Sequence, residues 1–248
     1  KSKASKSEVL LQIKSDIHAN IEAYQLQIEK GFTIVGATRN GTFWGTRTLL
    51  QLIDNYDNTI PQGTITDFPD SPKRGFMIDA GRKFFSMDFL RYYVKFMSYY
   101  KMNEFQVHLN DNGFKKFYDN DFMKTYSAFR LESDSFPGLT ARDGHYTKKE
   151  FRELQQLGMQ YGVNVIPEID VPAHALAFTQ YKPELAMNKD YMDHLSISAK
   201  DTGAVYSFID KLFREYTTGK NPVFVGPDFH IGTDEYDRRY APEFYFFT

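Results

Sequence analysis

The sequence contains no cysteine, which excludes disulfide bonds, thiolate metal ligands and a cysteine nucleophile together. Tryptophan is scarce too, since Trp44 stands alone beside 17 tyrosines and 23 phenylalanines. No stretch approaches the roughly 20 apolar residues that a membrane-spanning helix needs. Neither charge dominates, because 30 basic residues face 32 acidic ones. The composition therefore gives no electrostatic reason to expect a nucleic acid or an anionic membrane as a partner.

A break in the pattern divides the 248 residues into two predicted domains. The segment TDFPDSPKRG, residues 66–75, contains two prolines and shows no hydrophobic periodicity, as expected of a connection between folded units. We expect a small mixed unit over residues 1–68 and a larger domain over residues 69–248. A chain of this length can bury a sizeable core and is long enough to be an enzyme.

The small unit combines strand patterns with a helix pattern. Residues 24–29 and 32–38 are strand-like runs separated by Lys30-Gly31, which is typical of a β-hairpin. After a predicted turn at Asn40-Gly41, the spacing of apolar residues over 42–53 predicts a helix.

In the larger domain, short apolar strands alternate with helices. The predicted strands cover 75–80, 104–109 and 163–170, a fourth lies within 225–235, and the predicted helices cover 86–101, 147–162 and 206–217. Ser86 suits an N-cap, and Thr147 with Glu150 suits a capping box. This alternation predicts parallel βα units, either in a (β/α)8 barrel or in an open doubly wound sheet. No strand is followed by a G-x-G-x-x-G or Walker loop, which weakens nucleotide binding.

Polar side chains follow each predicted strand, and an irregular segment, residues 111–145, follows the second one. In barrel enzymes the carboxyl ends of the strands build the active site, and a loop this long is usually functional. A single aspartate at a strand end is more often a cap than a catalyst, so the prediction depends on several strands pointing charged groups at one rim. The residues concerned are Asp79, Arg82, His108, Asn110, Asp111, Glu168, Asp170, His174, His230, Asp234 and Glu235.

The stretch FHIGTDEY, residues 229–236, closes an apolar run with two adjacent carboxylates, Asp234 and Glu235. Side chains alternate along a strand, so Glu235 points away from Asp234 unless the strand ends before them. Carboxylates that lie close together raise one another's pKa, which suits a general acid beside an ionised neighbour and is typical of glycoside cleavage.

A metal-dependent hydrolase is the competing interpretation of the same residues. His108, His174, His230 and Asp234 would be the ligands. No H-x-H or H-E-x-x-H spacing supports such a site, so we favour a site without a metal.

Three motifs, in this order, resemble the β-N-acetylhexosaminidases of glycoside hydrolase family 20. They are KRGFMIDAGRKFFSMDFLRYYVKFMSYYKMNEFQVHLNDNGF at 73–114, VIPEIDVPAHA at 165–175 and FHIGTDEY at 229–236. Residues 31–53, GFTIVGATRNGTFWGTRTLLQLI, also resemble the small α/β domain that precedes the barrel in that family. The resemblance covers nearly the whole chain. It implies part of that α/β domain followed by the first half of a (β/α)8 TIM barrel, with the sequence stopping after the fourth strand as a fragment would.

The resemblance also implies roles for individual residues. Glu235 matches the general acid that protonates the glycosidic oxygen. Asp234 matches the residue that holds the substrate's 2-acetamido N–H, so that the acetamido oxygen is the nucleophile. Arg74 matches an arginine that binds sugar hydroxyls, and Asp111 and His174 match a polar relay that supports the acid. The residues expected to lie behind these are His108, Glu168 and His230.

The implied activity is the removal of terminal β-linked N-acetylglucosamine or N-acetylgalactosamine from glycans with retention of configuration. No metal or organic cofactor is implied, and the implied location is outside a bacterial cell or on its surface. Thr233, where glycine or alanine is usual, and Pro-Ala-His in place of Pro-Gly-His depart from the family pattern. Two alternatives stay open: a lacto-N-biosidase of the same family, and a non-catalytic carbohydrate-binding fragment. The preferred sugar and the oligomeric state are left open as well.

Overall fold

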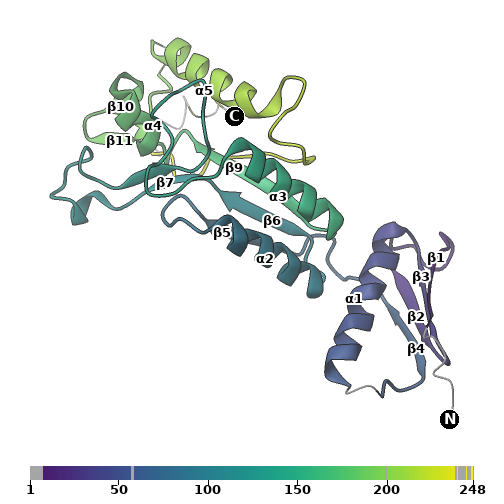
Figure 1. Ribbon diagram of the computed structural model, residues 1–248. Helices are drawn as coiled ribbons and strands as arrows, with labels where there is room; N and C mark the ends of the chain where they lie inside the picture. The colour runs from purple at the N-terminus through teal and green to yellow at the C-terminus, as the bar shows by residue number, and fades with distance from the viewer. Residues whose placement is uncertain are drawn as a thin grey trace. The chain divides into compact units, whose positions relative to one another are not determined.

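Figure 1 shows the computed structural model, which describes residues 8–56, 59–198, 200–237, 239, 244 and 247. The chain divides into two compact units. Unit 1 comprises Lys1–Arg74, Lys95–Asn103 and Tyr161–Val163, and unit 2 comprises Gly75–Val94, Glu104–Gln160 and Asn164–Thr248. Within the described residues, no helix is both long and apolar enough to cross a bilayer.

Unit 1 contains a four-stranded sheet and one long helix. Its elements are β1 (Val9–Ile13), β2 (Tyr24–Ile28), β3 (Phe32–Gly36), α1 (Arg39–Asn55) and β4 (Gly63–Asp67), in the strand order β1-β3-β2-β4. β2 and β3 pair in antiparallel fashion, which confirms the hairpin predicted around Lys30-Gly31. The core is formed by side chains of the sheet and of α1, namely Tyr24, Leu26, Ile28, Ile34, Trp44 and Leu49.

Helix α1 begins earlier than its apolar spacing predicts. Thr38 is its N-cap, and Oγ1 of Thr38 accepts hydrogen bonds from the backbone N–H of Asn40 at 3.2 Å and of Gly41 at 3.4 Å. This cap satisfies N–H groups that have no partner inside the helix. Asn40 and Gly41 therefore lie in the first helical turn, and the separate turn predicted there is wrong.

Unit 2 contains a parallel sheet, its crossover helices and two smaller ribbons. The elements are β5 (Gly75–Asp79), α2 (Met87–Tyr99), β6 (Glu104–His108), β7 (Asn110–Asn112), the 3-10 helix η1 (Lys115–Phe117), β8 (Ser127–Phe129), α3 (Lys148–Gln160), β9 (Asn164–Val171), α4 (Leu176–Tyr181), the 3-10 helix η2 (Pro183–Leu185), β10 (Ala186–Asn188), β11 (Tyr191–Leu195), α5 (Thr202–Thr217) and β12 (His230–Gly232). The last few residues of α2 belong to unit 1.

The parallel sheet has the strand order β12-β9-β6-β5. Each new strand is added on the same side as the one before, so the order does not reverse as it does in a doubly wound sheet. This topology is that of a partial (β/α)8 barrel. Figure 1 shows α2 and α3, the two crossover helices, lying along the sheet.

Two predicted helix starts in unit 2 are confirmed. Oγ of Ser86 accepts the N–H of Phe89 at 3.2 Å ahead of α2. At α3, Thr147 Oγ1 accepts the N–H of Glu150 at 3.1 Å, while the Glu150 carboxylate accepts the N–H of Thr147 at 3.0 Å. These reciprocal bonds form the predicted capping box.

Two long βα loops, one after β6 and one after β9, contain short elements of their own. β7 pairs with β8, and β10 pairs with β11, each as a short antiparallel ribbon. The first loop is anchored by Arg130, which is fully buried, donates to Ala80 O at 2.8 Å and Gly81 O at 3.1 Å, and pairs with Asp143 at 2.7 Å. Residues 111–145 are mostly irregular, as predicted, apart from β7, η1 and β8, and a buried guanidinium holds them in place.

Candidate active site

The carboxyl ends of β5, β6, β9 and β12 surround an open cavity of about 630 Å³. The carboxyl ends of parallel strands meet at one edge of a sheet, so polar residues from all four strands come together there. The cavity is lined by Met77, Asp79, Arg82, Gln106, His108, Asp111, Phe114, Glu168, His174, His230, Gly232, Asp234 and Glu235. Of the predicted site residues, Arg74, Asn110 and Asp170 do not line this cavity, although Nδ2 of Asn110 donates to the backbone oxygen of Asp170 at 2.9 Å on the adjoining strand β9.

Arg74 lies outside this cavity, and the prediction that placed it there is wrong. It precedes β5 and so stands at the amino end of the strand, whereas the cavity is at the carboxyl end. Its guanidinium serves unit 1, where Nε donates to Lys101 O at 2.7 Å and Nη1 lies 2.8 Å from the Glu22 carboxylate. A strand of five residues separates the two ends by roughly 17 Å.

Arg82, which follows β5, occupies the position expected of Arg74. Its Nη1 lies 2.9 Å from the Asp79 carboxylate and 2.6 Å from the Asp111 carboxylate, and its Nε donates to Asn112 O at 3.0 Å. The side chain is still 42% exposed, so its remaining N–H groups can donate to a ligand. Its place just after a strand is the sequence signal that distinguishes it from Arg74.

His108 is held between two carboxylates from different elements. Its Nδ1 lies 2.9 Å from Glu168 Oε2, and its Nε2 lies 2.9 Å from Asp111 Oδ2. Burial by itself lowers the pKa of His108, but the hydrogen bonds and charges of Asp111 and Glu168 outweigh burial and raise the pKa to about 10. His108 is therefore an imidazolium at neutral pH and donates from both nitrogens.

Asp111 is the point where three cationic groups meet. Besides His108 and Arg82, its carboxylate contacts Nδ1 of His174 at 3.0 Å. Burial raises the pKa of Asp111, but the hydrogen bonds from His108 and His174 outweigh burial and hold that pKa well below its usual range. Asp111 therefore stays ionised although it is 1% exposed.

Glu168 joins the fourth strand to this network. Its Oε1 lies 3.0 Å from Nδ1 of His230 on β12, and its Oε2 accepts from Nε2 of Gln106 at 2.9 Å. Burial raises the pKa of Glu168, but the bonds from His108 and Gln106 outweigh it, so the pKa is lowered. Glu168 thus connects His108 with His230, and both Glu168 and His230 support the His108 network.

The end of β12 turns the two adjacent carboxylates toward His174. β12 ends at Gly232, and φ is 71° at Gly232, 78° at Thr233 and 54° at Glu235. Nε2 of His174 then lies 3.5 Å from Asp234 Oδ2 and 3.3 Å from Glu235 Oε2. The expectation that the strand ends before the pair is confirmed. Left-handed φ at residues other than glycine costs about 1–3 kcal/mol each and recurs at functional sites.

His174 connects the buried part of the site with its exposed part. Burial lowers the pKa of His174, but the hydrogen bond to Asp111 and the charges of Asp111 and Asp234 outweigh burial and raise the pKa to about 9. Nδ1–H of the protonated ring donates to Asp111, whereas Nε2 forms no hydrogen bond with a described residue and lies within ion-pair distance of the carboxylates after β12. Asp111, His174 and Glu235 therefore form a continuous line from the base of the cavity to its mouth.

Asp170 is a member of the site to which the sequence pattern assigns no role. It is fully buried, and its Oδ1 accepts the backbone N–H of Thr233 at 3.1 Å. Burial is the main cause that raises the pKa of Asp170 to about 8, with a further contribution from Asp234 and opposition from His174. The site thus contains a carboxyl group that is mostly neutral at pH 7, at a position that lies within the motif VIPEIDVPAHA but to which the sequence assigns no individual role.

Three groups of side chains among the described residues lie close enough to share a metal ion. They are Asp79, His108 and Asp111; His108, Glu168 and Asp170; and Asp170, His174 and Asp234. A histidine binds a metal through an unprotonated nitrogen. Both ring nitrogens of His108 contact carboxylates, and the raised pKa values of His108 and His174 favour their protonated forms. These donors fit a hydrogen-bonded acid–base site better than a metal centre.

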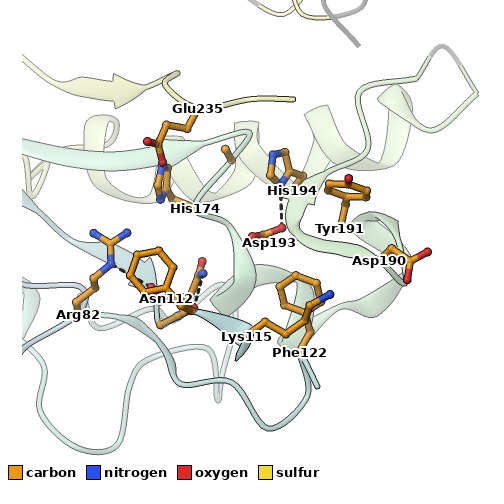
Figure 2. Close-up of a pocket in the computed structure, with 13 residues that line it drawn as sticks. Arg82, Asn112, Lys115, Phe122, His174, Asp190, Tyr191, Asp193, His194 and Glu235 are labelled. Atoms are coloured by element: carbon orange, nitrogen blue, oxygen red, sulfur yellow. Dashed lines mark hydrogen bonds and ion pairs between the residues drawn. The ribbon is translucent and has the colours of Figure 1, made fainter. Parts of the chain in front are cut away.

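A second cavity, of about 470 Å³, adjoins the first and shares Arg82, Phe114, His174 and Glu235 with it. Figure 2 shows Glu235 and His174 on one side of this cavity and residues of β11 on the other. The β11 residues are Tyr191, Asp193 and His194. They belong to no motif and lie on a strand that the sequence pattern does not predict, so sequence reasoning misses them.

The fold and the site together define a class, the (β/α)8-barrel proteins with an acid–base site at the carboxyl ends of the strands. Within this class the chain belongs to glycosyl hydrolase family 20, because residues 72–242 match the catalytic domain of that family and residues 1–68 match its domain 2.

Relatives of known name cover most of this chain. A β-hexosaminidase of Akkermansia muciniphila is 31% identical over 240 residues, which cover 91% of this chain and 48% of the relative. A β-hexosaminidase of Porphyromonas gingivalis is 29% identical over 243 residues, which cover 86% of this chain and 29% of the relative. The structure of a mutant Streptomyces plicatus β-hexosaminidase in complex with the product N-acetylglucosamine has a TM-score of 0.77 at 25% identity, covering 96% of this chain and 50% of that chain. The chain therefore spans about half or less of the length of these proteins.

Proposed function

We propose that this chain carries the acid–base part of a β-N-acetylhexosaminidase site, which removes terminal β-linked N-acetylglucosamine or N-acetylgalactosamine from glycans. The observation that carries the proposal is the position of His174, which contacts Asp111 on one side and the carboxylates of Asp234 and Glu235 on the other. Glu235 also lines both cavities. A glycosidic oxygen between a terminal sugar in one cavity and its leaving group in the other would lie beside Glu235.

In this proposal the substrate supplies its own nucleophile. The carbonyl oxygen of the 2-acetamido group attacks the anomeric carbon while the bond to the glycosidic oxygen breaks, and Glu235 gives its proton to that leaving oxygen. Asp234 accepts the acetamido N–H and offsets the positive charge of the oxazolinium ring. Glu235 then takes a proton from the water that opens the ring, so that configuration is retained.

Other side chains of the site prepare these steps. Arg82 is held by Asp79 and Asp111, which suits a guanidinium that donates to the hydroxyls of the terminal sugar. The protonated His174 stabilises Glu235 after it has lost its proton, because a positive charge then lies 3.3 Å from a carboxylate. Asp111 in turn keeps His174 charged and oriented.

Hydrolysis of 4-nitrophenyl N-acetyl-β-glucosaminide tests the proposal, with the 248-residue chain measured beside the protein at the length that its gene encodes. We expect turnover that a thiazoline mimic of the oxazolinium blocks and that a chelator leaves unchanged. Cleavage of a lacto-N-bioside alone would replace the proposal by a lacto-N-biosidase. Binding of N-acetylglucosamine without turnover of any glycoside would reduce the site to a carbohydrate-binding role. Location outside the cell stays a prediction, which fractionation of the source cells would check.

A further inference from the structure

One oxygen of Asp170 has no hydrogen-bond partner, although the side chain is fully buried. Asp170 lies one residue before the end of β9, on the same face of the strand as Glu168. Its Oδ1 accepts the N–H of Thr233, but its Oδ2 is 4.0 Å from Nε2 of His174, which is too far for a hydrogen bond. An ionised carboxylate with an unpaired buried oxygen is strongly disfavoured.

Asp234 is the neighbour that can satisfy this oxygen. Asp170, His174 and Asp234 each have a polar side-chain atom within 4.8 Å of the others, and a hydrogen bond with Asp234 is among the influences that raise the pKa of Asp170. Two ionised carboxylates cannot form a hydrogen bond, because neither carries a proton. If Asp170 is neutral, its O–H becomes a donor to Asp234, and the unpaired oxygen gains a partner.

The charged groups that face Asp170 come from each neighbouring strand. His108 ends β6, Glu168 shares β9, His174 follows β9 and Asp234 follows β12. Burial is the largest influence on the pKa of Asp170 and raises it. Asp234 raises this pKa further, whereas the positive charges of His174 and His108 lower it, and the resulting pKa is about 8. The charges around Asp170 thus agree with the geometry in favouring the neutral form at pH 7.

We propose that Asp170 is a positioning residue that works as a neutral carboxylic acid, with its Oδ2–H donating to Asp234 and its Oδ1 holding the backbone of Thr233. The proposal rests on the function proposed above, in which Asp234 accepts the acetamido N–H. One side chain then fixes both the backbone and the carboxylate of the turn after β12. Gly232 fits this arrangement, since a Cβ there would lie 1.7 Å from Oδ1 of Asp170. The carboxylate of Asp234 is thereby aimed at the positive charge that forms beside it.

Asp170→Asn is the sharpest variant, because the amide has nearly the same shape as the acid. Its NH₂ group donates to Asp234 at every pH, and its oxygen still accepts the N–H of Thr233. Asp170→Ala removes both interactions. Asp210→Asn is the matched control, since Asp210 is an exposed carboxylate on α5 that pairs with Arg214 at 2.7 Å.

The first readout is the pH profile of kcat/KM with a dinitrophenyl N-acetyl-β-glucosaminide, whose leaving group needs no proton from Glu235. We expect the parent protein to lose about tenfold from about pH 6.5 to about pH 9, because only about a tenth of an acid with a pKa of about 8 stays protonated at the higher pH. Asp170→Asn should stay within about threefold of the parent at about pH 6.5 and lose less than about twofold on the way to pH 9. Asp170→Ala should lose about 10²-fold throughout. An alkaline loss in Asp170→Asn equal to that of the parent would overturn the proposal.

Thermal unfolding gives a second readout that does not depend on catalysis. The pKa of Asp170 rises from 3.8 to about 8 on folding, so the folded state holds an extra proton between these values and Asp170 lowers stability as the pH rises through that range. Asparagine has no such proton. The Tm of Asp170→Asn minus that of the parent should therefore increase from about pH 4 to about pH 8 and then level off, with no trend in Asp210→Asn. A constant difference above about pH 5 would identify Asp170 as an ordinary ionised carboxylate and overturn the proposal. A rising difference without turnover of any glycoside would count against the proposed function and leave the Asp170–Asp234 contact standing.

Discussion

Arg82 holds its position in the cavity through two carboxylates, Asp79 and Asp111. We expect Arg82→Ala to lower kcat/KM for an aryl N-acetyl-β-glucosaminide about 10- to 100-fold, because hydrogen bonds from a charged group contribute about 1.5–3 kcal/mol. Arg74→Ala is the matched control, since Arg74 pairs with Glu22 in unit 1 and should affect stability but not KM. Steady-state kinetics of both variants decide between the two arginines. If KM rose in Arg74→Ala and not in Arg82→Ala, Arg74 would after all be the arginine that binds the sugar hydroxyls.

Glu235→Gln removes the proton that a poor leaving group needs. We expect kcat/KM for an N-acetylglucosaminyl disaccharide to fall by about 10²- to 10⁴-fold, with a much smaller loss for a dinitrophenyl glycoside. Asp234→Asn should damage both substrates, because the stabilisation of the oxazolinium charge does not depend on the leaving group. Near-normal rates in both variants would refute the roles assigned to the pair.

The catalytic carboxylates, the arginine of the cavity and the buried Asp170 differ in how far the sequence could predict their roles. Asp234 and Glu235 close an apolar run within a short motif, so their spacing and setting are local. Arg74 and Arg82 flank the same strand, but only Arg82 follows it, so the rule that active sites lie at the carboxyl ends of barrel strands favours Arg82. The role of Asp170 depends on contacts with Thr233 and Asp234, which lie far away in the chain and which no local pattern reveals.

The turn after β12 is shaped by the side chain beneath it, and two glycines test this. Gly232 has a φ of 71° and no room for a Cβ beside Asp170, whereas Gly219 has a φ of 94° and no atom within 4 Å of a Cβ. We expect Gly219→Ala to cost about 1 kcal/mol from backbone strain alone, with kcat unchanged. Gly232→Ala should cost more and should lower kcat, because Asp170 or the turn must move. Urea unfolding and kcat of both variants provide the check, and equal costs with unchanged kcat would show that the turn does not pack against Asp170.

The β2–β3 hairpin, the four parallel strands of unit 2 and helices α1, α2, α3 and α5 could be predicted, because their apolar spacing is regular and their caps are local. The strands β1, β4, β7, β8, β10 and β11 and helix α4 were not predicted. The sequence predicts too late a start for α1, because Asn40-Gly41 is typical of a turn and its pattern conceals the cap at Thr38. The order within 111–145 depends on the buried guanidinium of Arg130, whose partners Ala80 and Gly81 are distant in sequence. Elements built on such distant contacts carry little periodic signal.

His108 joins β6, β7 and β9 through its two carboxylate partners, so it matters for the stability of unit 2 as a whole. Its pKa rises from 6.5 to about 10 on folding. A raised folded pKa means that its contribution is fully present below the unfolded value and is lost as the pH rises through the folded value. We expect the difference in the free energy of unfolding between the parent and His108→Gln to shrink from about pH 7 to about pH 10. Urea titrations at both pH values measure it, and a difference that does not change with pH would show that His108 folds as a neutral ring.

The repeated strand–helix pattern predicts the α/β class of the molecule, but it leaves open whether the sheet curls into a barrel. That choice depends on strand order, β12-β9-β6-β5, which is set by contacts between distant segments. Contacts between distant segments also decide which residues belong to unit 1. This unit includes Lys95–Asn103 and Tyr161–Val163, which come much later in the chain than its other residues and which the sequence pattern does not assign to it.

The carboxylate of Asp111 serves three partners at once, Arg82, His108 and His174. Substitutions at groups that share one charge are expected to interact by about 0.5–3 kcal/mol, so their separate effects should not add up. Sugar binding, the stability of the sheet and the proton balance at Glu235 are thus tied to a single anion. Attempts to retune any one of these properties by directed evolution should therefore meet strong epistasis around Asp111, and successful variants should carry paired changes.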